Sequence, residues 1–572
     1  MSWLIGWTGP PAATPALPHE QHRHHDEGWG VVLGGLGATC QWGHHAEAGW
    51  HWNIVGLGMR LGDDGLYPLT AADWHALMPL SASALRNKLR RLNGHFVLVR
   101  WSAQEVQAFT DPLGTRTLYY AQHQQSLYLS TQLDVLARQV HATTLNLSAL
   151  GGHWLTFNQL SYDALLDGVG RLGPGGLLRY NRTANQLTVG AARWLPDTEA
   201  PTDPPMRVLE RVLHVHSPEA GRGRTVSLGL SGGIDSRLLL SLLSSGGDTY
   251  GLHTFGDASD PDVLLSEQLA QAVDAPRQHL AYPDPSAEEV LAIIERHVVQ
   301  TCATIPATAA LKLAAYAPLE AQHRLMIDGG FGEIGRRQFL NRLRYQRPLR
   351  FTDRALFFAF SVQRADVFAA DVHHALRQGA EAQLAEVFAL ARDAPVAGGA
   401  NRLDLLSIWT RLPNFFGHEQ ARLDAEVVNY MPFAQPAFLS AIMATPVGKR
   451  RHGRMYKRTI RQRTPALADL PLAKSGTTYP FGASTLGAWA VAKVKKRWGE
   501  HYTDLHRLIY LQRLEPMVRD LATGVAHVPL YDTAKVERLV AGFYSGDASQ
   551  AVALDWWLAF ELWRRALQPP SL

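Results

Sequence analysis

The sequence predicts an α/β protein with a β-rich N-terminal part, a parallel β-sheet with crossover helices and a largely helical C-terminal part. Short apolar runs at residues 95–101 and 126–131 are separated by turn-forming residues, as in neighbouring β-strands. From residue 225 onward, strand-like runs alternate with long helical patterns, which is typical of a parallel sheet whose strands are joined by helices. Beyond about residue 355 the pattern is mostly helical.

The chain length of 572 residues predicts at least two domains, because a single hydrophobic core rarely grows to this size. A polar, proline-rich segment at 198–205 suits a linker, so we expect domains at residues 1–197 and 206–572. Hydrophobic residues make up 46% and charged residues 19% of the chain, which is typical of a globular protein with a large core. The net charge of +4 is small for this length and does not indicate nucleic acid binding.

Cysteine usage and the N-terminal segment both indicate a cytoplasmic protein. Cys40 and Cys302 are far apart and form no Cys-x-x-Cys pair, which excludes a disulfide framework and argues against a cysteine zinc site. Residues 1–18 lack a basic region and are broken by prolines, unlike a signal peptide, and no apolar run is long enough for a membrane span. We interpret the His-rich residues 19–28 as a solvated loop rather than a metal site.

A Ser-Gly-Gly-Ile-Asp-Ser sequence at residues 231–236 joins a predicted strand to a predicted helix. Alternating apolar residues precede it at 226–230, and leucines that share one helical face follow it at 238–243. In open α/β sheets, the carboxyl end of a strand is where ligands bind. The sequence therefore predicts a ligand-binding loop at this position.

The residue types of this loop indicate phosphate chemistry. Gly232 and Gly233 let backbone N–H groups approach phosphate oxygens, and the following helix N-terminus favours an anion. Ser231 and Ser236 add hydroxyl donors. Asp235 would repel bare phosphate, so its presence indicates Mg²⁺ bridging the phosphates. The structural alternative is a turn with an aspartate that caps the helix.

The loop resembles the signature of the PP-loop ATP pyrophosphatase superfamily, whose members split ATP between the α- and β-phosphates. The resemblance implies ATP and Mg²⁺, with pyrophosphate held in the loop and AMP passed to the substrate. It also implies that adenine lies along residues 228–230 and 254–256. The nucleotide-binding residues implied are Leu230, Ser231, Gly232, Gly233, Asp235, Ser236, Thr254, Phe255, Gly329 and Gly330.

Three further segments resemble asparagine synthetases. Residues 111–120 follow that family's Asp-Pro-x-Gly-x-Arg-x-Leu-Tyr-Tyr pattern in its class II glutamine amidotransferase-like domain. Residues 426–446 are similar to its Pro-Phe segment, and residues 470–482 to its catalytic-lysine loop. The resemblance implies that Lys474 binds charge on the α-phosphate during adenylation. Alone, each segment also fits an ordinary β-turn or a surface lysine.

The chain departs from that family at several catalytic positions. It begins Met-Ser-Trp rather than Met-Cys-Gly, so we expect a degenerate amidotransferase-like domain without a nucleophilic cysteine. In residues 327–337 the family's magnesium-binding aspartate falls on Gly332, and Asp328 or Glu333 is left as its replacement. The family's general base aligns with Gly329, so no general base can be assigned.

A glutaminase-dead homologue of this kind resembles the lasso-peptide macrocyclases. The resemblance implies adenylation of an Asp or Glu side chain in a precursor peptide, followed by attack of the peptide's N-terminal amine. The implied partners are the precursor, a leader peptidase and a leader-binding protein. Basic stretches at 336–350 and 449–463 fit solvated helix faces, phosphate contacts or docking of an acidic peptide.

Two other readings remain open. A β-lactam synthetase-like or ammonia-dependent asparagine synthetase-like enzyme would act on a small molecule and need no peptide. A non-catalytic scaffold is suggested by the altered loop at residues 328–333.

Overall fold

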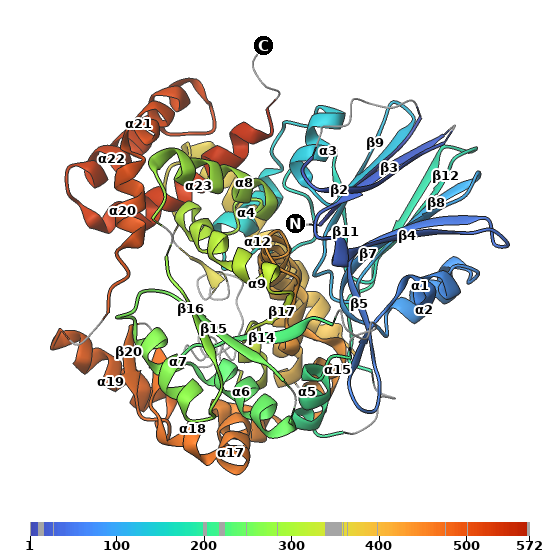
Figure 1. Ribbon diagram of the computed structural model, residues 1–572. Coiled ribbons are helices and arrows are strands. Elements are labelled where there is room, and N and C mark those ends of the chain that lie inside the picture. Colours follow the sequence, from blue (N-terminus) through green and yellow to red (C-terminus); the bar gives the residue numbers. More distant parts are fainter. Residues whose placement is uncertain are drawn as a thin grey trace.

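Two antiparallel β-sheets form the N-terminal part of the computed structural model (Figure 1). The structure describes every residue except 1, 10–16, 27, 198–202, 217–222, 248, 283, 338–356, 358–359, 363, 397–398, 475, 500–501 and 569–572. The first sheet has the strand order β11-β9-β10-β1-β3-β2, and the second β13-β12-β8-β7-β5-β4 with β6 beside β5. Their strands are β1 (Trp3–Thr8), β2 (Glu20–His25), β3 (Trp29–Gly34), β4 (Cys40–His45), β5 (Trp50–Leu61), β6 (Leu66–Pro68), β7 (Asn93–Trp101), β8 (Glu105–Thr110), β9 (Leu118–His123), β10 (Ser126–Ser130), β11 (Gly170–Leu172), β12 (Leu177–Asn181) and β13 (Gln186–Gly190).

Strand β7 shows how these sheets are layered, because its alternate side chains enter two different cores. Val97 packs between the sheets in one core with Trp29, whereas Phe96 faces outward into a second core with Trp74. Both faces of the strand are therefore covered, and all nine of its residues are buried. The helices of this part are α1 (Ala71–Leu77), α2 (Ala82–Leu89), α3 (Leu133–Val140) and α4 (Leu147–Leu155).

Five parallel strands form the sheet of the second part, in the order β16-β15-β14-β17-β18. The chain runs outward from β14 through β15 to β16 and then places β17 on the opposite side of β14. The strand order thus reverses beside β14, and ligands bind at such reversal points in open α/β sheets. The elements are α5 (Pro205–Leu213), β14 (Thr225–Gly229), α6 (Ile234–Gly246), β15 (Gly251–Phe255), α7 (Pro261–Gln271), β16 (Arg277–Leu280), α8 (Ala287–Thr301), α9 (Ala317–Ala321), β17 (Arg324–Ile327) and β18 (Asn429–Tyr430).

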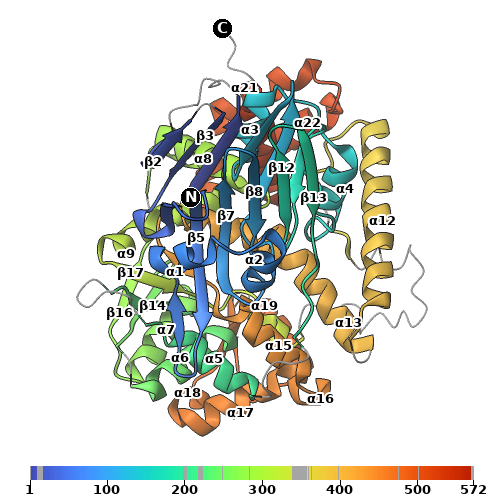
Figure 2. The same ribbon diagram turned by 90° about the vertical axis from the view of Figure 1, so that its right-hand side faces the viewer.

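The remaining helices cover both parts of the molecule, and α12 runs along the sandwich beside α4 (Figure 2). One apolar core joins Met59 of the sandwich to Leu228 of the parallel sheet, and another joins Trp154 to Phe560. The elements are α12 (Ala370–Asp393), α13 (Gly399–Leu406), α14 (Gly417–Leu423), α15 (Pro436–Ala444), α16 (Val447–Arg450), α17 (Arg454–Arg463), α18 (Pro465–Asp469), β19 (Leu472–Lys474), β20 (Thr477–Tyr479), α19 (Thr485–Arg497), α20 (His506–Arg513), α21 (Glu515–Gly524), α22 (Thr533–Tyr544) and α23 (Ala551–Ala566).

This arrangement confirms the predicted α/β fold class, with an antiparallel β-rich part followed by a parallel sheet and a helical C-terminal region. The interpretation of residues 19–28 as a loop was wrong, because β2 pairs with β3 as the edge strand of the first sheet. Its polar, largely exposed side chains hide the strand pattern. In the part of the chain that the structure describes, no helix is long and apolar enough to cross a membrane.

The structure describes the basic stretch at residues 449–463 and only the first two residues of the stretch at 336–350. Residues 338–350 lie outside the described residues, so only Arg336 and Arg337 of the first stretch can be placed. In the second stretch, Arg450 is fully buried and donates to Asp404 at 2.8 Å. That stretch is therefore partly structural rather than a uniformly solvated face.

Candidate active site

The Ser-Gly-Gly loop leaves the carboxyl end of β14 and enters α6 at the point where the strand order reverses. Gly233 is the N-cap of α6, and no side chain caps the helix there. The first N–H groups of α6 are therefore open to an anionic ligand, which the helix N-terminus favours. Ser231 and Ser236 share a hydrogen bond of 3.0 Å between their hydroxyls, which holds both at the mouth of the loop.

Gly232 has a packing role. Its N–H donates to Asp262 at 2.8 Å, and its carbonyl accepts from the N–H of Ala473 at 3.0 Å. A Cβ atom at this position would lie 2.6 Å from Cβ of Ala473 and 2.9 Å from Leu265. A side chain larger than hydrogen would thus push the lysine strand β19 away from the loop.

Beside the loop lies a cavity of about 450 Å³, which we call the loop cavity. Its lining includes all of the residues predicted to bind nucleotide except Gly232: Leu230, Ser231, Gly233, Asp235, Ser236, Thr254, Phe255, Gly329 and Gly330. The structure thus brings together segments that are about 100 residues apart in the chain. Their individual roles in nucleotide binding remain predictions.

Sequence reasoning missed several other residues that line the loop cavity. Asp260, Asp262 and Asp504 add carboxylates to it, and Lys312 adds a cation. Burial raises the pKa of Asp260 and of Asp262 above the usual range. Asp504 comes from the segment before α20, so no local motif links it to the loop.

Aromatic side chains also line the loop cavity. Phe255 lies edge-to-face with Tyr282 at a centroid distance of 4.5 Å, and the Lys312 ammonium lies 5.6 Å from the Tyr282 ring centre. Thr254 donates from its hydroxyl to the carbonyl of Leu230 at 2.9 Å, which ties β15 to the end of β14. An apolar wall with fixed polar groups is the usual lining of a site for a planar ring.

Asp235 does not point to open solvent but forms a two-pronged ion pair with Arg336. The guanidinium donates to its two carboxylate oxygens at 2.8 Å and 2.5 Å. Burial alone would lower the pKa of Arg336, but Asp235 outweighs it and the net pKa is raised. A Cβ atom on Gly332 would lie 2.6 Å from Cγ of Asp235, so the glycine is what lets this loop pack against the carboxylate.

The two candidate replacements for the missing family aspartate lie in different surroundings. Asp328 lines the loop cavity and accepts from the N–H of Gly330 at 2.7 Å, while burial raises its pKa to about 6. Glu333 instead accepts from Arg411 at 3.0 Å and does not belong to the cavity lining. The structure therefore brings Asp235 and Asp328 together around one cavity, and places Glu333 outside it.

These residues can be tested for their fit to Mg²⁺. Among the described residues, no group of three or more His, Cys, Asp or Glu side chains is arranged to hold a metal ion. Mg²⁺ commonly takes only one or two carboxylates and completes its shell with phosphate oxygens and water. Asp235 and Asp328 fit that mode, provided that Arg336 releases Asp235. The metal role of all three carboxylates remains a prediction.

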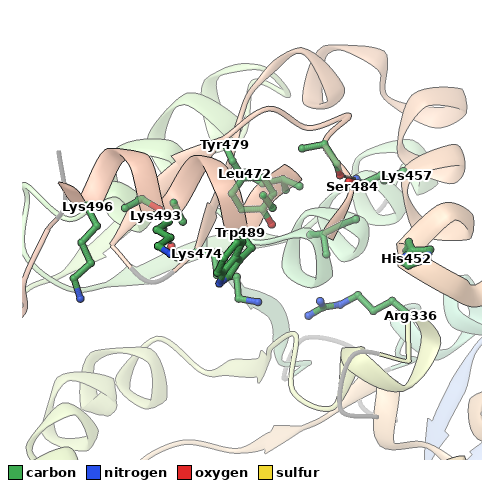
Figure 3. A pocket seen from close by; sticks show the side chains of 16 residues that line it. Arg336, His452, Lys457, Leu472, Lys474, Tyr479, Ser484, Trp489, Lys493 and Lys496 are labelled. Atoms are coloured by element: carbon green, nitrogen blue, oxygen red, sulfur yellow. Dashed lines mark hydrogen bonds between the residues drawn. The ribbon is translucent and has the colours of Figure 1, made fainter. Parts of the chain in front are cut away.

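Lys474 ends strand β19 and lines a second cavity, of about 540 Å³, together with Arg336 (Figure 3). Burial, and then the nearby charge of Arg336, lower the pKa of Lys474. The hydrogen bond from Ala473 to Gly232 places this lysine directly beside the phosphate loop. The predicted lysine and the predicted loop, about 240 residues apart in sequence, are therefore neighbours in the fold.

Arg237 explains why they are neighbours, and the sequence reasoning overlooked it. Its guanidinium is fully buried and donates to the carbonyls of Leu467 at 2.9 Å, Leu470 at 2.7 Å and Pro471 at 2.5 Å. It also donates to Gly232 at 3.2 Å, and burial lowers its pKa to about 10. The sequence does contain a signal for this role, because an arginine among the leucines at the start of a buried helix needs hydrogen-bond acceptors within the fold.

The Asp-Pro-x-Gly-x-Arg pattern of the N-terminal part has a structural role. Asp111 is buried and accepts backbone N–H groups from Leu113, Thr115 and Arg116 at 2.8–3.0 Å. Arg116 then reaches across to the second part and donates to Asp424 at 2.7 Å. The motif thus fixes a turn and anchors the sandwich to the parallel-sheet part.

The two thiols of the chain are poor candidates for catalysis. Both cysteines are buried, and burial raises the pKa of Cys40 to about 12 and that of Cys302 to about 11. A thiol needs a lowered pKa and access to solvent to act as a nucleophile. The described thiols therefore contribute to packing.

The fold has an antiparallel sandwich joined to a parallel sheet that carries the Ser-Gly-Gly loop. Residues 46–190 match the family model of the glutamine amidotransferase domain. This match confirms the amidotransferase-like fold predicted for the N-terminal part, which precedes the parallel sheet.

Comparison with curated proteins gives no match. Solved structures with some similarity include glutamine phosphoribosylpyrophosphate amidotransferase from B. subtilis complexed with ADP and GMP, at 12% identity and a TM-score of 0.17. That alignment covers 40% of this chain and 46% of the other. Another, described as the allosteric regulatory enzyme of purine biosynthesis, has 11% identity and a TM-score of 0.20, over 44% and 51% of the two chains. The chain thus spans about half the length of each.

Proposed function

We propose that this protein is an ATP-dependent amide ligase that forms AMP and pyrophosphate, and that it closes a lasso-peptide ring. Its substrate is then a precursor peptide whose Asp or Glu side chain is joined to the peptide's own N-terminal amine. The observation that carries the proposal is the position of Lys474, held beside the uncapped N-terminus of α6 by the Ala473–Gly232 hydrogen bond. A phosphate loop and a lysine in this arrangement suit the release of pyrophosphate from an α-phosphate.

In the proposed first step, a carboxylate oxygen of the peptide attacks the α-phosphorus of ATP. The bond from that phosphorus to the bridging oxygen breaks, and pyrophosphate leaves toward the N–H groups of α6 and the hydroxyls of Ser231 and Ser236. Lys474 offsets the charge that develops on the α-phosphate. Mg²⁺ held by Asp235 and Asp328 would supply further charge neutralisation on the phosphates.

In the proposed second step, the N-terminal amine attacks the carbonyl carbon of the acyl-adenylate. A carbon–nitrogen bond forms, the carbon–oxygen bond to AMP breaks, and the amine loses a proton. Adenylation is needed because a free carboxylate has no competent leaving group. Holding amine and acyl-adenylate in one site supplies much of the rate, since the reaction becomes intramolecular.

The test is to incubate the protein with ATP, Mg²⁺ and a leader-free candidate precursor peptide that carries an Asp or Glu acceptor, and to measure pyrophosphate, AMP and the peptide mass. Loss of one water from the peptide together with stoichiometric AMP and pyrophosphate is the expected result. Product formation from free amino acids without peptide would instead assign a small-molecule amide synthetase.

The ion pair between Asp235 and Arg336 favours a second candidate, a non-catalytic scaffold. In that case Arg336 is a permanent replacement for the metal, and the loop never binds Mg²⁺ with ATP. The absence of pyrophosphate under all of the conditions above, together with unchanged thermal stability on addition of Mg²⁺ and ATP, would support it.

A further inference from the structure

The second cavity lies between the lysine strand and helix α19, and we call it the α19 pocket. Sixteen side chains line it, and Figure 3 shows Arg336 and Lys474 reaching into it below Trp489. It shares no described lining residue with the loop cavity. The Asp235–Arg336 ion pair lies between the two cavities, because Asp235 lines the loop cavity and Arg336 lines the α19 pocket.

The α19 pocket is strongly basic. Its described lining has five basic side chains, with no carboxylate among them: Arg336, Lys457, Lys474, Lys493 and Lys496. Arg336 is paired with Asp235, and the Lys457 ammonium donates to the carbonyl of Ala483 at 2.7 Å. Positive charge in a concave site concentrates anions there.

Helix α19 forms one wall of this pocket with an incomplete hydrophobic interface. None of its described side chains from residue 487 onward is buried, and Trp489 is 64% exposed. A helix on a protein surface normally buries one apolar face. The small side chains of Ala488 and Ala492 line the pocket on this helix together with Trp489. The wall therefore offers an apolar surface beside the lysines.

From these observations we infer that the α19 pocket binds an acidic segment of the peptide substrate. This inference rests on the proposed function for the identity of the substrate as a peptide. Carboxylates of the segment would pair with Lys493 and Lys496, while its apolar side chains would pack on Trp489. The segment would then lie on the Arg336 side of the ion pair, next to the phosphates in the loop cavity.

A peptide explains the pocket better than a nucleic acid or a free phosphate does. Single-stranded nucleic acid is held by successive aromatic platforms along a basic groove, whereas the described lining of this pocket has Trp489 and Tyr479 on different elements. The hydroxyl donors proposed for phosphate, Ser231 and Ser236, line the loop cavity, whereas Lys493 and Lys496 line the α19 pocket alone. The alanines and Trp489 of the wall serve neither of these ligands.

The test measures binding without ATP, using a short fluorescein-labelled peptide rich in glutamate and tryptophan, and a twin with glutamine in place of glutamate. Lys496→Glu and Lys493→Glu should each weaken binding of the acidic peptide about tenfold, by replacing attraction with repulsion. Arg497→Glu is the matched control, because it makes the same charge change one residue away and Arg497 is not in the lining. The glutamine twin should bind at least about tenfold more weakly to the unchanged protein.

Equal weakening by Lys496→Glu and Arg497→Glu, or equal binding of the two peptides, would overturn the inference. So would tighter binding of an oligothymidylate, or displacement of the acidic peptide by an equal concentration of pyrophosphate. If the protein binds the acidic peptide but releases no pyrophosphate, the proposed function fails and the inference about the α19 pocket does not. If the unchanged protein releases pyrophosphate but does not bind the acidic peptide, only the inference about the α19 pocket is rejected.

Discussion

The loop cavity and the α19 pocket meet at one ion pair and carry opposite charge. The loop cavity is lined by five aspartates and one lysine, whereas the described lining of the α19 pocket has five cations and no carboxylate. Carboxylates therefore outnumber cations on the Asp235 side of the ion pair, and the described lining on the Arg336 side has cations alone. An acidic cavity suits a nucleotide that arrives with Mg²⁺, and a basic pocket suits an acidic substrate. The contrast predicts that reactants enter from opposite sides of the ion pair.

The largest effect is expected at Arg237, because its hydrogen bonds join the segment before β19 to Gly232 of the loop. Arg237→Met leaves the buried carbonyls of residues 467, 470 and 471 without their charged donor, and should cost about 4 kcal/mol in the free energy of unfolding. Pyrophosphate release should fall as well, since Lys474 would lose its position. Urea unfolding and a pyrophosphate assay measure the two effects.

Arg458→Met is the matched control for that substitution. Arg458 lies exposed on α17, so its loss should change the unfolding free energy by no more than about 0.5 kcal/mol. If both variants were equally stable, the buried arginine would not be what fastens β19 to the phosphate loop.

The second-largest effect is expected at Asp235, because this residue lines the loop cavity and also forms the ion pair with Arg336. Asp235→Asn keeps the shape but removes the charge, and should lower the rate of pyrophosphate release at least about 100-fold. The mutant should also lose any Mg²⁺-dependent rise in melting temperature, which is a readout independent of turnover. Full activity in this variant would remove Asp235 from the site.

Arg336→Met tests whether Arg336 competes with Mg²⁺ for the carboxylate of Asp235. Without the guanidinium, both carboxylate oxygens of Asp235 become available, so Mg²⁺ should raise the melting temperature more than it does in the unchanged protein. The comparison of melting curves with and without Mg²⁺ measures this. An identical response in both proteins would show that Arg336 does not compete with the metal.

Lys474→Met should lower pyrophosphate release about 100-fold while leaving the unfolding free energy nearly unchanged, because the side chain is exposed at the end of β19. Lys495→Met serves as the control, since the Lys495 ammonium donates to Thr478 and does not line the α19 pocket. Equal activities would argue that β19 merely supports the loop.

Sequence reasoning predicted the fold class and the loop well because both depend on local patterns. The change from strand to helix around residue 231 is visible in the spacing of leucines, and the segment at 111–120 lies within the matched amidotransferase domain. Strand β2 was missed because a polar edge strand lacks the apolar alternation that marks a half-buried strand.

The Asp235–Arg336 ion pair and the hydrogen bonds of Arg237 could not be predicted in the same way. Asp235 and Arg336 are 101 residues apart, and Arg237 binds carbonyls about 230 residues away. Such contacts depend on tertiary packing, here on Gly332 and Gly232 letting neighbouring segments approach closely. No local periodicity carries that information, so the opposite charge of the two cavities appears only in the fold.

The smallest effect concerns the pH dependence of the loop cavity. Burial raises the pKa of Asp328 to about 6 in the folded protein, from an ordinary 3.8. The folded state therefore holds this proton more tightly than the unfolded state between these values, and stability falls as pH rises from about 4 through about 6. This rise in the pKa, discounted because Asp328 is only half-buried, corresponds to about 2 kcal/mol of unfolding free energy.

Asp328→Asn should abolish that contribution and make the protein about 2 kcal/mol more stable than the unchanged protein at neutral pH, with little difference near pH 4. Urea unfolding at several pH values measures it, and Asp469→Asn, at an exposed aspartate, is the control. Because Mg²⁺ favours the ionised carboxylate, added Mg²⁺ should shrink the difference between Asp328→Asn and the unchanged protein. A pH-independent difference would mean that the Asp328 carboxyl is ionised throughout, so that the loop cavity would carry its full negative charge even in acid.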